Sequence, residues 1–362
     1  MANVLDIKRR IRSVTNTRQI TKAMKMVSAA KLRRAQERAL AARPYSQMLT
    51  NVLKSLVSRA EIYDPETGEP RHPLLAERPE KTILLIVVTG DKGLAGAFNA
   101  NILKTGQKFL DSKADVNVDI VCVGRKGRDF LKRRYPMGKT LSPALDEMLE
   151  GAVTERAPVE RAGRVQIVGE HVGVLGKLDF SQARALAESV VEQFTRGEID
   201  GVYLLYNEFK SVIAQRLIVE HLLPIKEIGV VDVRLAEEAE EEERKRRIEA
   251  AKSAGVGVRG PETREIDAKA AEFGTMPVDY IYEQPAEHMF RQLLPRYIGT
   301  QIFHALLESV AAEHAARMTA MEAATSNATD MIESLTLVMN RARQAKITKE
   351  IIEIVSGAAA AG

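Results

Sequence analysis

The C-terminal end of the chain is the feature that most limits the fold. From Thr300 to Ser356 the sequence contains neither glycine nor proline and is dense in Ala, Glu, Met, Leu and Arg. These residues favour helix, and nothing interrupts them. At about 1.5 Å per residue the segment predicts a rod of roughly 85 Å, whereas a globular helix usually has about a dozen residues. We therefore expect this rod to pair with another helix and to be surrounded by other proteins.

The first 43 residues supply the candidate partner helix, because they also lack glycine and proline. Apolar side chains first recur at helical spacing, at Val4, Ile7, Ile11 and Val14. After a polar run the stripe resumes one position out of phase, at Ile20, Met24 and Val27. Such a slip predicts a local overwinding of a coiled coil. Pro44 predicts a kink in the same helix.

The apolar residues of the C-terminal rod follow a seven-residue pattern with alternating steps of three and four. They are Met321, Ala324, Ala328, Met331, Leu335, Val338, Ala342 and Ala345. Alanine at many of these positions lets two helices approach closely. We therefore expect both ends of the chain to pack as an antiparallel two-helix coiled coil, with an ordinary long core helix as the alternative.

The middle of the chain has the pattern of an α/β domain. Residues 82–88 (TILLIVV) form a continuous apolar run, which is typical of a buried parallel strand. Further strands are expected at 118–123, 164–168, 201–206 and, more weakly, 211–220, with a helix at 180–196. Because strands and helices alternate, the predicted fold is α/β plus long α, with a Rossmann-like parallel domain between the two terminal helices.

Composition shifts divide the chain further. Prolines at 65, 70, 73 and 79 indicate a linker, and a nearly continuous acidic run at 237–243 followed by basic residues at 244–247 indicates an exposed charged helix with a flexible loop after it. The expected segments are an N-terminal coiled-coil helix at 1–57, a linker at 58–80, the α/β domain at 81–233, a charged insertion at 234–275, the end of the α/β domain and a link at 276–299, and the C-terminal coiled-coil helix at 300–358.

Charge is unevenly distributed along the chain, although the net charge is only +4. Residues 1–43 hold twelve Lys or Arg against two acids, whereas residues 300–362 hold five basic against seven acidic residues. The excess positive charge on the N-terminal helix needs an acidic partner, which could be nucleic acid, a lipid surface or acidic protein loops.

The same composition excludes several classes of protein. No apolar run approaches the roughly 18 residues needed to cross a bilayer. The single cysteine, Cys122, excludes an intramolecular disulfide and fits a reducing compartment. The N-terminus is rich in Arg, but a helical stripe already begins at Val4, so we expect no transit peptide.

Motifs for chemistry are weak or misplaced. A GxGxxG match at 255–260 follows a charged run instead of a strand and precedes Pro261, which excludes a dinucleotide site. The loop 90–96 is better placed, after a strand and before a helix. It could hold an anion on its amides or simply be a tight turn, and the residues leave both open. The six histidines are scattered, so no catalytic, cofactor-binding or metal-binding residue is predicted.

Ordered motifs occupy both ends and the middle of the chain. They are IKRRI at 7–11, QITKAMKMVSA at 19–29, DKGL at 91–94, GRKG at 124–127, LLPRY at 293–297, ARM at 316–318, AM at 320–321, AT at 324–325, RQA at 343–345, IT at 347–348 and EIVSGA at 353–358. In order and spacing they closely resemble the gamma subunit of F-type ATP synthase. The resemblance covers all but about 60 residues, and the segment 234–275 is not part of the common pattern.

The resemblance implies a central rotor shaft. In this family the terminal helices enter a ring of alternating alpha and beta subunits, and the α/β domain sits against the epsilon subunit and the membrane c-ring. Proton flow turns the ring and the shaft, one copy per complex, peripherally on the cytoplasmic face of the cell inner membrane. The resemblance implies no catalytic site and no cofactor in this chain, and a structural role for the loop 90–96. The dithiol switch of the photosynthetic members cannot operate with Cys122 as the only cysteine.

By the same resemblance, ten residues would contact the alpha/beta ring: Arg9, Arg10, Lys22, Met24, Arg33, Arg317, Arg343, Gln344, Thr348 and Glu350. Two other functions remain as alternatives. One is a basic coiled-coil protein that binds nucleic acid, which would need the C-terminal rod to stay free. The other is a nucleotide-using α/β enzyme built on the loop that begins at Gly90.

Overall fold

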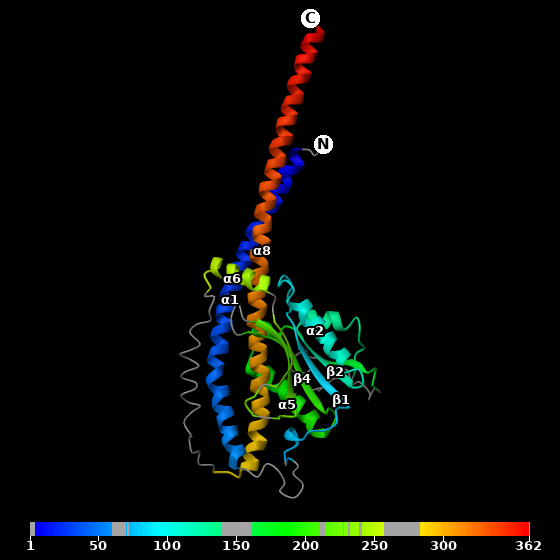
Figure 1. The fold of residues 1–362 in the computed structure, drawn as a ribbon, viewed down its shortest axis with the longest axis vertical. Helices are drawn as coiled ribbons and strands as arrows, with labels where there is room; N and C mark the ends of the chain where they lie inside the picture. Colours follow the sequence, from blue (N-terminus) through cyan, green and yellow to red (C-terminus); the bar gives the residue numbers. More distant parts are fainter. Residues whose placement is uncertain are drawn as a thin grey trace.

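Two long helices run along each other and carry a small α/β domain on one side (Figure 1). The computed structural model describes residues 4–59, 70, 72–138, 161–209, 215–226, 228–230, 232–238, 241–256 and 283–361. Helix α1 spans Val4–Arg59 and helix α8 spans Ala286–Ala361. Most of the expected linker and the glycine motif beyond Val256 lie outside the described residues.

The domain is built on a six-stranded sheet with the order β3-β2-β1-β4-β5-β6. Its strands are β1 (Thr82–Val88), β2 (Asn117–Val123), β3 (Val165–His171), β4 (Gly201–Phe209), β5 (Gln215–Leu223) and β6 (Asp232–Glu238). The first four are parallel, as their apolar runs predict, whereas β5 and β6 are antiparallel additions at one edge. The predicted fold class is confirmed, with a mixed sheet instead of a purely parallel one.

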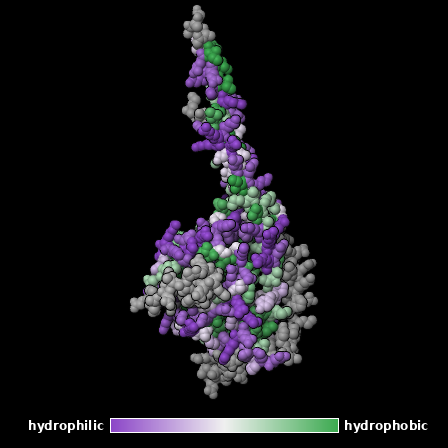
Figure 2. All heavy atoms as spheres, turned by 180° about the vertical axis from the view of Figure 1, so that it is seen from behind, coloured by the Kyte–Doolittle hydropathy of each residue, from purple (hydrophilic) through white to green (hydrophobic). Residues whose placement is uncertain are grey.

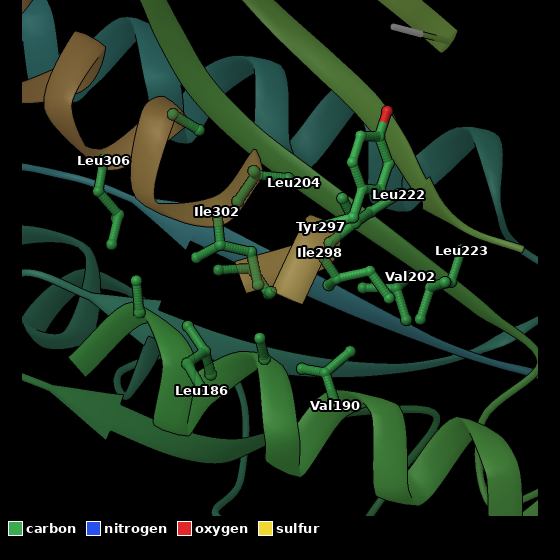
Figure 3. Packing of buried hydrophobic residues seen from close by; sticks show 14 of the residues in the cluster. Leu186, Val190, Val202, Leu204, Leu222, Leu223, Tyr297, Ile298, Ile302 and Leu306 are labelled. Carbon is green, nitrogen blue, oxygen red and sulfur yellow. The ribbon is translucent and has the colours of Figure 1, made fainter. Parts of the chain in front are cut away.

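Each face of the sheet is covered by different helices, because successive strand residues point to opposite faces. Helix α2 (Phe98–Ser112) and the short helix α3 (Arg125–Leu131) cover one face, where Ile83 and Leu85 are buried. Helix α5 (Phe180–Arg196) and the lower part of α8 cover the other. Figure 3 shows α8 side chains such as Ile298 and Ile302 packed between Val190 of α5 and Val202 of β4. Two short 3₁₀ turns, Pro73–Leu75 and Val174–Lys177, complete the connections.

Along α1 the inward-facing positions keep one unbroken seven-residue register. They are residues 7, 11, 14, 18, 21, 25, 28, 32, 35, 39, 42, 46, 49, 53 and 56, all buried or half-buried. The predicted slip in phase is therefore wrong. Ile20 and Val27, which suggested it, are 60% and 56% exposed. The inward positions between them are polar, so the apolar pattern of the sequence could not reveal the true register.

The seam of α8 matches the prediction at some positions, including the half-buried Ala324, and differs at others, including the exposed Ala345. Met321, Ala328, Leu335 and Ala342 face inward as expected, but Met331 and Val338 are exposed. The adjacent apolar residues Ile332 and Met339 are the half-buried ones. Because both members of each pair are apolar, the sequence allowed either choice. Helix α1 continues through Pro44, as expected, and the kink at this residue stays a prediction. Helix α8 begins at Ala286, ahead of Pro295, instead of near residue 300.

The two helices are antiparallel, and α8 extends beyond the N-terminal end of α1. Thr325 donates a hydrogen bond of 2.8 Å to Thr21, and Lys25 lies 2.6 Å from Glu322. With equal rise per residue in both helices, Val4 then lies opposite about residue 342. The last turns of α8 therefore continue as a single helix, which Figure 1 shows extending well beyond the N-terminal end.

The charged segment predicted to be an exposed insertion contributes to the fold instead. Its first residues belong to β6, and helix α6 (Glu241–Ser253) follows. Helix α6 buries Ala250 and Ala251 completely and Arg247 almost completely, against the long helices. The expectation of a wholly exposed charged helix is wrong, because these small side chains give no strong hydrophobic signal. The domain boundaries themselves remain a prediction.

A buried carboxyl lies where the sheet meets α8. Tyr206 of β4 donates a hydrogen bond of 3.0 Å to Glu220 of β5, and Glu308 of α8 is also buried. Burial raises the pKa of Glu220 to about 7; the Tyr206 hydroxyl opposes the rise, and the Glu208 carboxylate adds to it. Because the folded state holds this proton more tightly than the unfolded chain, Glu220 destabilises the fold as pH rises from about 4.5 through 7.

We predict that Glu220→Gln removes this penalty. Relative to the variant, the parent chain should lose about 3 kcal/mol of unfolding free energy between pH 5 and pH 8. Urea unfolding of the isolated chain at both pH values measures this. Glu188→Gln, at an exposed position of α5, is the matched control and should show no such pH-dependent difference. Equal pH dependence in the parent chain and Glu220→Gln would contradict the prediction.

Candidate interaction surface of the helical shaft

The upper surface of the paired helices is basic on the α1 side. Arg9, Arg10 and Lys22 are exposed, and Arg9 reaches Asp6 at 3.6 Å on the same helix. Met24 is half-buried beside the seam. These four predicted contact residues lie on the part of the shaft that rises above the sheet, as Figure 1 shows for the N-terminal end of α1. The three basic residues among them present cations to anything that approaches the shaft from outside.

The projecting end of α8 carries the other group of predicted contacts. Arg343, Gln344, Thr348 and Glu350 are all exposed there. Lys346 lies 3.6 Å from Glu350, an exposed pair one turn apart. Within the described residues no helix lies opposite their side chains, because the pairing with α1 ends near residue 342.

An apolar stripe on the same projecting end was missed by the sequence analysis. It consists of Ile347, Ile351 and Ile354, spaced four and three apart and all largely exposed. Figure 2 shows hydrophobic side chains on this part of the rod among hydrophilic ones. The signal was present in the sequence as helical spacing. An exposed apolar stripe on a lone helix marks a surface that another protein covers.

Two of the ten predicted contacts bind groups within the chain: Arg317 is buried, whereas Arg33 is exposed. Arg317 is only 8% exposed; it forms an ion pair with Glu313 and donates to the Gly93 carbonyl at 3.4 Å. Arg33 of α1 donates to the Gly255 carbonyl at the end of α6. Burial raises the pKa of the Glu313 carboxyl, and the Arg317 guanidinium opposes that rise. The geometry thus gives Arg317 a role inside the chain, tying α8 to the loop 90–96.

This loop stands at the carboxyl end of β1, beside β4, where the strand order reverses. Such a switch point is where open α/β sheets commonly bind ligands. Here the Gly90 amide donates to Asn99 at 2.8 Å, and Asp91 accepts from the amides of Arg125 and Gly173 at 3.0 and 3.1 Å. A Cβ on Gly90 would come within 2.8 Å of the Glu313 carboxyl. The crevice is filled by α8, which favours the tight-turn interpretation over an anion cradle.

A second hollow, of about 510 Å³, lies between α2 and β6. Its polar lining is already paired, because Lys113 and the Tyr203 hydroxyl both donate to Glu80. Over the residues described, no three potential metal-binding side chains come together, and none of the helices is both apolar enough and long enough for a membrane span. The described part of the chain thus offers contact surfaces more clearly than a reaction centre.

Such a molecule is a helical-shaft protein whose exposed end needs partners, and comparison with known proteins agrees. A family model described as ATP synthase matches residues 3–361. The ATP synthase gamma chain of Solibacter usitatus is 44% identical over 361 residues, covering 100% of both chains. That of Geobacter metallireducens is 42% identical, covering 99% of this chain and 98% of the relative. The chain therefore belongs to the ATP synthase gamma-chain family, and the resemblance seen in the sequence is confirmed.

The alignment and a solved structure add two details. The Solibacter chain aligns over the whole of this chain, so the charged segment at 234–275 falls inside the matched region. A chain from the structure titled as Euglena gracilis mitochondrial ATP synthase, OSCP/F1/c-ring, rotational state 3, matches with a TM-score of 0.50 and 17% identity, over 99% of this chain and 94% of that chain. At this identity the likeness shows the fold alone.

We predict that two arginines, both expected from the sequence to contact the alpha/beta ring, differ strongly in their effect on the stability of the isolated chain. Arg317→Ala leaves Glu313 buried without its cation and should lower the unfolding free energy of the isolated chain by about 3–5 kcal/mol. Arg343→Ala, at the exposed end of α8, should change it by less than about 0.5 kcal/mol. Urea unfolding of both variants gives the comparison. If Arg317→Ala were as stable as the parent chain, the ion pair between Arg317 and Glu313 would not stabilise the fold.

Proposed function

We propose that this chain is the central rotor shaft of an F-type ATP synthase. It transmits torque between a proton-driven membrane ring and a ring of alternating alpha and beta subunits, so that ATP synthesis or hydrolysis is coupled to proton movement. The observation that carries the proposal is the single projecting end of α8, with exposed contact residues on a helix that is continuous down to the α/β domain.

Mechanical continuity supports a torque-carrying role. Helix α8 has 76 residues, a length of roughly 110 Å, and α1 lies along it from the domain to about residue 342. The lower part of α8 is held between α5, the sheet and α1. A twist applied to the projecting end therefore reaches a firmly packed base through one unbroken hydrogen-bonded helix.

The two ends of the molecule would contact different partners. The projecting end and the basic face of α1 would contact the alpha and beta subunits, and the α/β domain would sit against the epsilon subunit and the c-ring. The protein would act as a single copy, held peripherally at the cytoplasmic face of the cell inner membrane. Exposed ion pairs contribute little each, so the contacts with successive catalytic subunits can be exchanged during rotation.

Catalysis belongs to the partners in this proposal. The loop at Gly90 is engaged with α8, which speaks against a nucleotide-using enzyme. The nucleic-acid-binding alternative needed a free C-terminal rod, whereas α8 is paired with α1 along most of its length. The chain would serve as a non-catalytic subunit without a cofactor of its own.

A double substitution tests the contact surface. Arg343→Ala together with Gln344→Ala should lower ATP turnover of the assembled complex about tenfold, the loss expected when about 1.4 kcal/mol of barrier-lowering contact disappears. The isolated chain should keep its stability, because both side chains are exposed. Glu333→Ala with Ser334→Ala, exposed on the paired part of α8, is the control and should leave turnover unchanged. Unimpaired turnover in the first double variant would remove these residues from the working surface.

Cross-linking tests rotation itself. A cysteine introduced at Gln344 should be the reactive thiol, because Cys122 is buried and burial raises its pKa to about 12. A reducible cross-link from this position to a beta subunit should stop proton-coupled turnover, and reduction should restore it. Full proton-coupled synthesis in the cross-linked complex would contradict the rotor role.

A further inference from the structure

At one level of the paired helices the inward side chains of α1 are polar, whereas Met321 and Ala328 of the facing part of α8 are buried and apolar. Above and below that level the inward positions of α1 are apolar, for example Ile7 and Leu32. Between them, Thr21, Lys25 and Ser28 are buried. We call this level, residues 18–28 of α1 with the facing part of α8, the neck. Figure 1 shows it where the paired helices emerge from the α/β domain.

Polar contacts join the two helices at the neck. Thr325 donates to Thr21 at 2.8 Å, and the Lys25 ammonium lies 2.6 Å from Glu322. The Lys25 side chain is only 7% exposed, whereas that of Glu322 is 26% exposed. A polar seam fixes register but stabilises a coiled coil less than an apolar one does. A buried ion pair also depends strongly on the groups that exclude water from it.

Helix α6 supplies those groups. It lies across the long helices at the neck (Figure 1), and Ser253 at its end accepts a hydrogen bond of 3.0 Å from Lys25. The Lys25 ammonium, on α1, thus contacts α6 and α8 together. Ala250 and Ala251 of α6 and Val256 after it join the hydrophobic cluster that contains Leu32. Arg33 adds a bond to the Gly255 carbonyl.

The attachment of α6 is small compared with that of the core helices. Its fully buried apolar side chains are two alanines, with one valine beyond its end. Its outer face is charged and holds its own pairs, Glu241 with Lys245 and Glu242 with Arg246. Segments with few buried apolar contacts open at lower free energy than the core of a protein. A small apolar attachment of this kind favours local opening of α6 before the core unfolds.

We propose that α6 is a detachable brace that controls the stiffness of the neck. When α6 is docked, Lys25 and Glu322 are shielded and the two shaft helices stay in register. When α6 leaves, water reaches Lys25 and the polar seam opens locally. The brace is a property of the chain alone, and only its effect on torque rests on the proposed function.

The test uses two neighbouring positions of α6. Ala251→Asp places a charge at a fully buried site and should undock the helix, whereas Lys252→Asp changes an exposed site one residue away. Hydrogen exchange of the isolated full chain reports the outcome. Amides of residues 18–35 should exchange at least about tenfold faster in Ala251→Asp than in the parent chain, with no change in Lys252→Asp. Parent-like exchange in Ala251→Asp would overturn the proposal.

A milder variant covers the case in which Ala251→Asp unfolds the domain. Ser253→Ala removes only the hydroxyl that contacts Lys25. If exchange rises throughout Ala251→Asp, including β1 and α5, then Ser253→Ala decides: faster exchange confined to the neck supports the brace, and unchanged exchange overturns it. In the assembled complex, Ala251→Asp should reduce protons pumped per ATP hydrolysed, and Lys252→Asp should not. If exchange at the neck rises but proton pumping stays unchanged, the brace stands and only its effect on torque is overturned. A failure of the rotor role itself would instead be seen as full proton-coupled synthesis in the cross-linked complex.

Discussion

Packing of α8 against different neighbours along its length is the constraint on which the rest of the structure depends. At its base α8 is a core helix, with Leu294, Ile298 and Ile302 fully buried between α5 and the sheet. Higher up it is one of two helices, and at its end it stands alone. Because one hydrogen-bonded helix passes through all three environments, the anchored base, the polar neck and the unpartnered end cannot move independently.

The position of α8 also accounts for an α/β domain whose usual ligand crevice is closed. Four parallel strands with a glycine loop after β1 are the arrangement in which other proteins bind phosphates. Here Glu313 lies against Gly90, and Arg317 binds the Gly93 carbonyl. The small residues of the loop are needed for this close approach. The same loop architecture thus serves to fasten a long helix to a sheet.

The sequence predicted the elements well and the side-chain environments less well. Strand β1 was evident because TILLIVV is apolar on both faces, and both long helices were evident because breakers are absent. The register of the seam was not, since Met331 and Ile332 are equally apolar and Thr21, Lys25 and Ser28 carry no hydrophobic signal. The inward contacts of Arg317 were not evident because its partners include Gly93, a residue 224 positions away in the chain. Helix α6 was read as exposed because its buried face is mainly alanine.

Some of the basic residues of α1 bind groups within the chain, so less of the positive charge of this helix is available to a partner. Twelve basic residues against two acids give the N-terminal helix an excess of positive charge, but Lys25 is bound to Glu322 and Arg33 to the Gly255 carbonyl. Arg9, Arg10 and Lys22 remain on the outside, where salt screens them and each contact is weak. The end of α8 instead exposes Ile347, Ile351 and Ile354, whose burial is not weakened by screening of charges. The proposed shaft therefore has two kinds of surface: an apolar end suited to lasting enclosure, and a basic flank suited to contacts that are made and released in each turn.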